Sequence, residues 1–80
     1  MEIKVLGTGC ARCRQLEKDV TAVLASLDVE AAVEKVQDIQ KIMAYNVMST
    51  PALVINEKVK VFGRVPSRSD LSRYIREELV

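Results

Sequence analysis

Two cysteines placed three residues apart are the side chains of this 80-residue chain best suited to chemistry. Within a helical turn, residues with the spacing of Cys10 and Cys13 have Cβ atoms about 5–6 Å apart, close enough for a disulfide after a small adjustment. The pair can therefore open and close without remodelling the fold. The sequence contains no His, so it lacks the commonest general base and the commonest zinc ligand. The spacing predicts reversible thiol–disulfide exchange.

The two thiols are expected to have different roles because a helix is predicted to begin at Ala11. Cys10 then faces the unsatisfied N–H groups and the positive end of the helix dipole, which favour a thiolate. Arg12 and Arg14 add positive charge nearby, and together these effects lower the pKa of the Cys10 thiol. We expect Cys10 to be the nucleophile and Cys13, one turn further in and less exposed, to resolve the mixed disulfide. Arg12 is either a solvated helix-face charge or a substrate-binding residue that steers an acidic partner.

A Thr-Pro step before an unbroken apolar run is predicted to form the second half of the site. A trans proline at the start of a buried strand would only remove a hydrogen-bond donor from the sheet. A cis X-Pro bond costs only about 0.5–1 kcal/mol, so packing can hold it. We therefore expect a cis bond between Thr50 and Pro51 that leaves the backbone of Thr50 free to pair with an extended substrate. The alternative is a plain turn that enters a strand.

Hydrophobic periodicity and the placement of Gly and Pro predict seven elements. The first four are a strand at Ile3–Leu6, a helix from Ala11 to Leu27, a strand at Val29–Val36, and a short helix capped by Asp38 and ended by Asn46. The remainder are a strand at Ala52–Ile55, a tight turn at Asn56–Glu57, an edge strand in which Val59 and Val61 alternate with Lys58 and Lys60, and a final helix opened by a Ser67–Asp70 capping box.

This element order predicts the fold class. The order β-α-β-α-β-β-α is that of one α/β domain, taken here to span residues 1–80, with a mixed four-stranded sheet and helices on both faces. The first strand, helix and strand form a right-handed crossover with parallel strands. The last two strands form a hairpin.

Composition excludes several classes of function. Apolar residues make up 49% of the chain and charged residues 29%, which is typical of a globular domain. The net charge of +1 and the shortage of aromatic rings argue against a nucleic-acid partner. No apolar run is long enough for a membrane span, and the first residues are unlike a secretory signal. We expect a cytoplasmic monomer that does not associate with membranes.

The combined pattern resembles the thioredoxin superfamily. The features that carry the resemblance are the strand-to-helix Cys-x-x-Cys, the Thr-Pro before an apolar strand, the hairpin that ends at Gly63, and the capped last helix. The length is similar to that of the glutaredoxin-sized branch. Residues 7–13, 49–55 and 61–64 are most similar to the small redox-active disulfide proteins of archaea and bacteria.

The resemblance implies a thioredoxin-like fold and a thiol–disulfide oxidoreductase that reduces disulfides in protein substrates. Cys10 and Cys13 would form the redox-active disulfide, and no other cofactor and no metal are implied. Electrons would come from an upstream thiol reductase or a low-molecular-weight thiol. Arg12, Thr50 and Pro51 would bind substrate.

A soft-metal carrier is the alternative that uses the same two thiolates. Gly-Thr-Gly-Cys-x-x-Cys also resembles heavy-metal-binding modules, in which two thiolates hold Cu(I). Those modules have the order β-α-β-β-α-β, whereas a helix capped by Asp38 is predicted here between the second and third strands. A third possibility is an interaction domain that retains the fold without catalysis.

Overall fold

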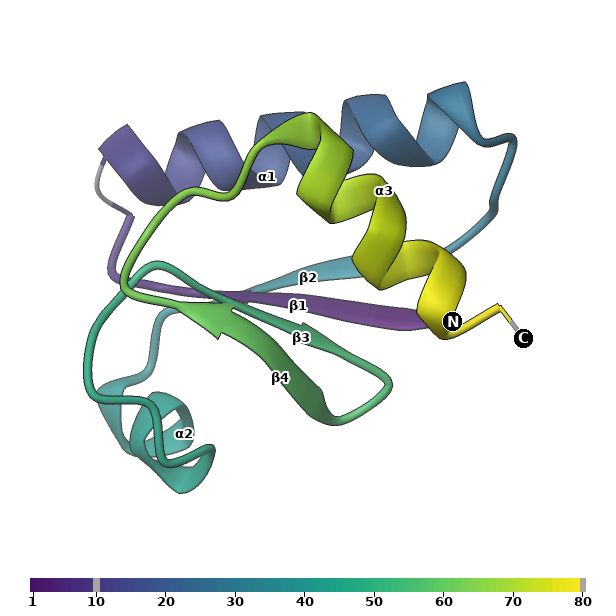
Figure 1. Cartoon of the computed structure of the whole chain (residues 1–80). Helices are drawn as coiled ribbons and strands as arrows, with labels where there is room; N and C mark the ends of the chain where they lie inside the picture. The colour runs from purple at the N-terminus through teal and green to yellow at the C-terminus, as the bar shows by residue number, and fades with distance from the viewer. Residues whose placement is uncertain (10, 80) are drawn as a thin grey trace.

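Four strands and three helices follow one another in the predicted order (Figure 1). The structure is a computed structural model, and it describes residues 1–9 and 11–79. The elements are β1 (Glu2–Leu6), α1 (Ala11–Ser26), β2 (Ala32–Val36), α2 (Ile39–Ala44), β3 (Ala52–Ile55), β4 (Lys58–Phe62) and α3 (Arg68–Glu77). The predicted fold class, a mixed four-stranded sheet with helices on both faces, is confirmed.

The strands form one sheet in the order β2-β1-β3-β4. β1 is parallel to β2, from Glu2 opposite Ala32 to Leu6 opposite Val36. It is antiparallel to β3, with Leu6 opposite Ala52, and β3 and β4 form the predicted antiparallel hairpin. Because β1 ends where β3 begins, the loop after β1 and the residues that precede β3 lie at the same end of the sheet.

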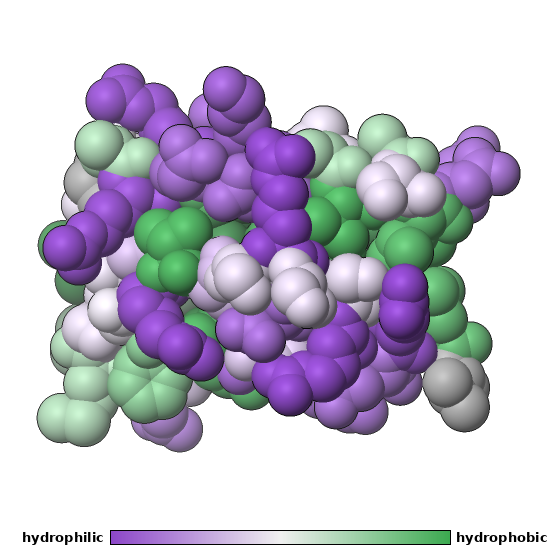
Figure 2. Space-filling model, turned by 45° about the horizontal axis from the view of Figure 1, so that its top comes forward, coloured by the Kyte–Doolittle hydropathy of each residue, from purple (hydrophilic) through white to green (hydrophobic). Residues whose placement is uncertain are grey.

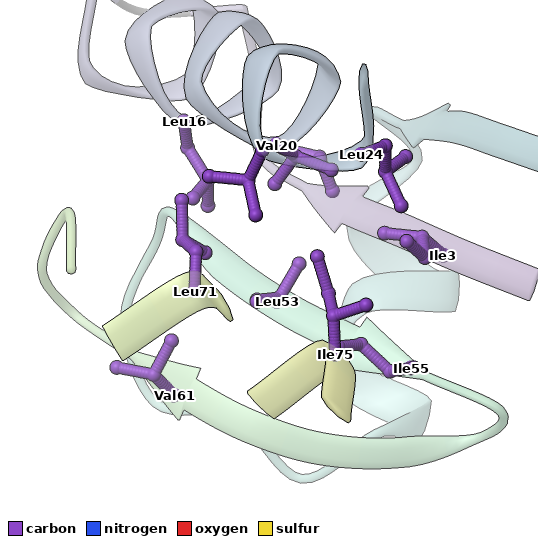
Figure 3. Packing of buried hydrophobic residues seen from close by; sticks show 11 residues of the cluster. Ile3, Leu16, Val20, Leu24, Leu53, Ile55, Val61, Leu71 and Ile75 are labelled. Carbon is purple, nitrogen blue, oxygen red and sulfur yellow. The ribbon is translucent and has the colours of Figure 1, made fainter. Parts of the chain in front are cut away.

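The main core lies between one face of the sheet and the helices α1 and α3 (Figure 3). Leu16 and Val20 of α1 point toward the sheet, and Leu71 of α3 points into the same space. Burying each such side chain contributes about 1.5–3 kcal/mol. The buried members are Ile3, Val5, Leu16, Val20, Val23, Leu24, Leu53, Ile55, Val61, Leu71 and Ile75.

The short helix α2 covers part of the opposite face and closes a smaller core. Asp38 caps α2 as predicted, since its side chain accepts a hydrogen bond from the backbone N–H of Gln40 at 2.9 Å. Asn46 follows α2 with φ of 60°, the left-handed conformation expected there. The buried residues of this second core are Leu6, Val36, Ile42, Ala52 and Val54.

A buried carboxylate joins α1 to α3. Asp19 lies on α1 and is only 7% exposed, although it is a charged residue. Its Oδ1 accepts hydrogen bonds from Gln15 Nε2 at 2.9 Å and from Arg68 Nε at 3.3 Å. Since Arg68 is the first residue of α3, this contact fixes the start of the last helix against the helix that carries Cys13.

Two sequence predictions about strands need correction. The predicted strand at Val29–Val36 begins only at Ala32, because its partner β1 begins at Glu2 and leaves residues 29–31 beyond its end. The hairpin contains a register shift at Lys60, so Val59 and Val61 lie on opposite faces of β4. The predicted alternation, which would place these two valines on one face, is therefore wrong.

The surface that α1 and α3 present is predominantly hydrophilic. Figure 2 shows purple side chains over most of this face, and they divide the green hydrophobic surface into separate patches. None of the helices in the described part of the chain is both long and apolar enough to cross a membrane.

Candidate functional site

Gly7 brings the two halves of the predicted site together. It follows β1, is buried, and its N–H donates to the carbonyl of Val36 at 2.9 Å. A methyl group at Gly7 would overlap Sγ of Cys13 and would lie 3.9 Å from Cβ of Thr50. Only a residue without a side chain allows the backbone to approach this closely. The β1–α1 loop, the first turn of α1 and the segment before β3 therefore meet at Gly7.

Cys13 lies in the first turn of α1 and is 5% exposed. Cys10, the predicted nucleophile, lies outside the described residues; in the sequence it directly precedes Ala11, the first residue of α1. The first turn of α1 contains no acidic residue, whereas Arg12 and Arg14 are exposed there. The positive end of the helix dipole and the two arginine side chains therefore both contribute positive charge at this end of α1.

The Thr50–Pro51 segment is adjacent to Cys13 and is held by the hairpin. The Thr50–Pro51 bond is cis, as predicted, and Pro51 is fully buried. The carbonyl of Pro51 accepts a hydrogen bond from the N–H of Gly63 at 2.9 Å. Gly63 has φ of +81°, a left-handed conformation that favours glycine. The end of β4 therefore fixes the start of β3 beside the first turn of α1.

A small hollow of about 210 Å³ opens beside Cys13, between α1 and the edge strand β2. Its polar lining comes from Arg14 on α1, Lys35 on β2 and Gln37, which follows β2. The remaining lining residues are Val5, Gly7, Gly9 and Cys13. The hollow therefore combines a buried cysteine with two cationic side chains and an amide.

A three-residue polar network links β1 to α2 and the hairpin turn. Lys4 Nζ donates to Glu57 Oε1 at 2.8 Å and to the Tyr45 hydroxyl at 2.9 Å, and that hydroxyl donates to Glu57 Oε2 at 3.0 Å. The hydrogen bond to Glu57 and then the one to Tyr45 raise the pKa of Lys4 above its ordinary value. The hydrogen bond from Lys4 lowers the pKa of Glu57. Tyr45 directly follows α2, so the network anchors the chain that leads to Thr50.

The described residues offer no cluster of metal ligands. Over residues 1–9 and 11–79, no three His, Cys, Asp or Glu side chains are grouped in a way that could hold a metal ion.

The sequence predicted that Cys13, Thr50 and Pro51 lie in one site, but it did not predict two features of that site. The contact between Gly7 and Cys13 has no signal in the sequence, because a glycine after a strand is expected at a turn whether or not another side chain packs against it. Lys35 and Gln37 belong to the hollow because β2 lies beside β1, and only the parallel register could have placed them there. Arg12 is exposed and lies in the same turn of α1 as Arg14, which lines the hollow.

Comparison with known proteins gives a consistent result. Residues 1–76 match the family described as "Thioredoxin domain". The chain is 31% identical over 75 residues to a thioredoxin of Methanothermobacter thermautotrophicus, covering 94% of this chain and 97% of the relative. It is 27% identical over 77 residues to a thioredoxin of Methanocaldococcus jannaschii, covering 96% and 88% of the two chains. Among solved structures, thioredoxin 1 of Thermosipho africanus has a similar fold, with a TM-score of 0.63, 23% identity, and coverage of 99% and 94%.

Proposed function

The chain belongs to the thioredoxin domain family, a family of thiol–disulfide oxidoreductases, and we propose that it reduces protein disulfides through Cys10 and Cys13. The observation that carries the proposal is the position of Cys13, buried in the first turn of α1 against Gly7 and beside Thr50. A side chain held in this contact has little freedom to reorganise, which suits a thiol that must attack the mixed disulfide formed at Cys10, three residues earlier.

The proposed reaction transfers two electrons in two exchange steps. The Cys10 thiolate attacks one sulfur of the target disulfide, the target's other sulfur leaves as a thiolate, and a mixed disulfide forms. The Cys13 thiolate then attacks the Cys10 sulfur, releasing the second target thiolate and leaving a Cys10–Cys13 disulfide. An upstream thiol reductase or a low-molecular-weight thiol returns the two electrons. No other cofactor takes part.

Substrate binding is assigned to residues around the buried thiol. The backbone of Thr50 would pair with an extended segment of the target protein, and Pro51 would shape that surface. Arg12, exposed in the first turn of α1, would attract an acidic partner. The protein would act as a monomer in the reducing cytoplasm, on protein disulfides rather than on nucleic acids or membranes.

Two cysteine variants test the mechanism. We expect Cys10→Ser to abolish dithiothreitol-driven reduction of a disulfide-bonded protein, because the attacking thiolate is lost. We expect Cys13→Ser to accumulate a covalent adduct with the substrate through Cys10, visible by mass spectrometry and removed by excess thiol. Robust turnover by Cys10→Ser would contradict the assignment.

A metal titration separates this proposal from the carrier alternative. Cu(I) is added to the reduced wild-type protein and to Cys10→Ser, and the stoichiometry of tight binding is compared with the rate of disulfide exchange. Tight stoichiometric binding without exchange would favour a carrier. The order β-α-β-α-β-β-α of the structure differs from that of the metal-binding modules, which supports the oxidoreductase.

A further inference from the structure

The hollow beside Cys13 is too small for a whole ligand but large enough for one side chain. Pockets for drug-sized molecules measure about 300–1,000 Å³. The hollow measures about 210 Å³ and is open to the surface between α1 and β2. Its volume therefore suits a single group that a larger partner inserts when it docks at the thiols.

The polar side chains that line the hollow favour an inserted group with negative charge. Arg14 and Lys35 are exposed cations on opposite walls, and the amide of Gln37 can donate hydrogen bonds. One carboxylate, that of Glu17, approaches Lys35 with Oε2 at 3.4 Å from Nζ. This pair neutralises one cation and holds Lys35 at the wall, so Arg14 supplies the excess positive charge.

Further positive charge surrounds the thiol end of the molecule. Arg12 is exposed in the same turn of α1 as Arg14. Arg64 is exposed and directly follows Gly63, which is hydrogen-bonded to the carbonyl of Pro51. Cations on both sides of the site favour partners with acidic surfaces, since long-range attraction speeds their encounter.

We propose that the hollow binds the carboxylate of an acidic residue that flanks the reactive cysteine of the protein substrate. The inference rests on the proposed function and adds a substrate class to it. A guanidinium can bind a carboxylate through two parallel hydrogen bonds, which fixes orientation as well as adding affinity. A carboxylate held there lies beside Cys13, so the substrate's disulfide is brought close to that thiol.

A pair of disulfide peptides tests the proposal. Each peptide has one internal disulfide, and the two differ only in having Glu or Gln on both sides of one cysteine. The rate of reduction by the pre-reduced protein is divided by the rate with dithiothreitol alone, which removes differences in intrinsic reactivity. We expect the Glu peptide to react about two- to fivefold faster, the range given by a partly exposed ion pair.

Variants locate the effect. Arg14→Gln should bring the Glu-to-Gln rate ratio close to one, and Arg14→Lys should restore part of it. Lys18→Gln removes the same charge from an exposed position of α1 that does not line the hollow, so the ratio should persist. Lys35→Gln should also lower the ratio, because it leaves the carboxylate of Glu17 at the wall.

The outcomes separate this inference from the proposed function. Equal rates for the two peptides with the wild-type protein would overturn the carboxylate site and leave disulfide reduction intact. The carboxylate site would also be overturned if the Glu-to-Gln rate ratio of Arg14→Gln equalled that of the wild type. The same holds if Lys18→Gln lowered this ratio as much as Arg14→Gln does. Failure to reduce either peptide would overturn the proposed function itself.

Discussion

The sulfur of Cys13 occupies the space that a side chain at Gly7 would need. The two residues come from different elements, since Gly7 follows β1 and Cys13 lies in the first turn of α1. This contact sets the distance between the first turn of α1 and the end of β1. The contact also keeps the thiol of Cys13, the proposed resolving cysteine, buried.

Replacing Gly7 by Ala should displace the Cys13 thiol and destabilise the fold. Overfilling a packed site costs about 1–3 kcal/mol, and the new methyl group has no space while Sγ is present. We expect a lower midpoint of urea unfolding and slower disulfide exchange.

A double-mutant cycle shows whether the sulfur is the cause. In a Cys13→Ala background the obstructing atom is gone, so Gly7→Ala should cost measurably less than in the wild type. If the cost is equal in both backgrounds, the backbone at Gly7 and not the contact with Cys13 requires glycine.

The contact between Asp19 and Arg68 should contribute to stability by joining two helices. Arg68 is largely exposed, so its removal by Arg68→Gln should cost only about 0.5–1 kcal/mol. Asp19→Ala should cost more, about 1–2 kcal/mol, since the hydrogen bond from Gln15 is lost as well. Urea unfolding of both single variants and the double variant measures the coupling. Strictly additive effects would show that the ion pair contributes nothing.

Acid should weaken the attachment of the C-terminal helix to the hairpin. The side chain of Glu78 is 8% exposed, and its carboxylate accepts a hydrogen bond from Lys60 Nζ at 2.8 Å. This hydrogen bond is the main cause of the lowered pKa of Glu78, and Lys58 lowers that pKa further. A lowered pKa in the folded state stabilises the protein above the ordinary value of 4.5, and this stabilisation is lost as the pH falls through the folded-state pKa.

The variant Glu78→Gln should therefore be less stable than the wild type at pH 7. The difference should shrink as the pH falls below about 4.5, as measured by urea unfolding at several pH values. In a Lys60→Gln background, the same substitution should have a smaller effect at pH 7. A difference that is equally large at pH 3 and pH 7 would exclude the ion pair as its origin.

Local signals predicted most of the fold because the residues that carry them act on their immediate neighbours. Asp38 caps α2 and Asn46 ends it. Ser67 caps α3 by accepting a hydrogen bond from the N–H of Asp70 at 3.1 Å. Each of these contacts spans a few residues, so the sequence alone contains the information needed to predict it.

Some features that depend on pairing between distant segments were not predicted. The bulge at Lys60 depends on how β4 fits β3, and the late start of β2 depends on where β1 begins. The hollow likewise requires Arg14 and Lys35, which are 21 positions apart, to face one another across α1 and β2. Periodicity shows which face of an element is apolar, but it does not show which polar side chains of two elements meet.

The order of the strands has a consequence for synthesis on the ribosome. β1 precedes the other strands in the sequence but lies inside the sheet, where one neighbour, β3, is synthesised only after α1, β2 and α2. α3 covers the core beside α1, on the same face of the sheet, and follows the other six elements in the sequence. The thiols are therefore synthesised before the segments whose packing positions them, and we expect redox competence to arise only after α3 has emerged from the ribosome.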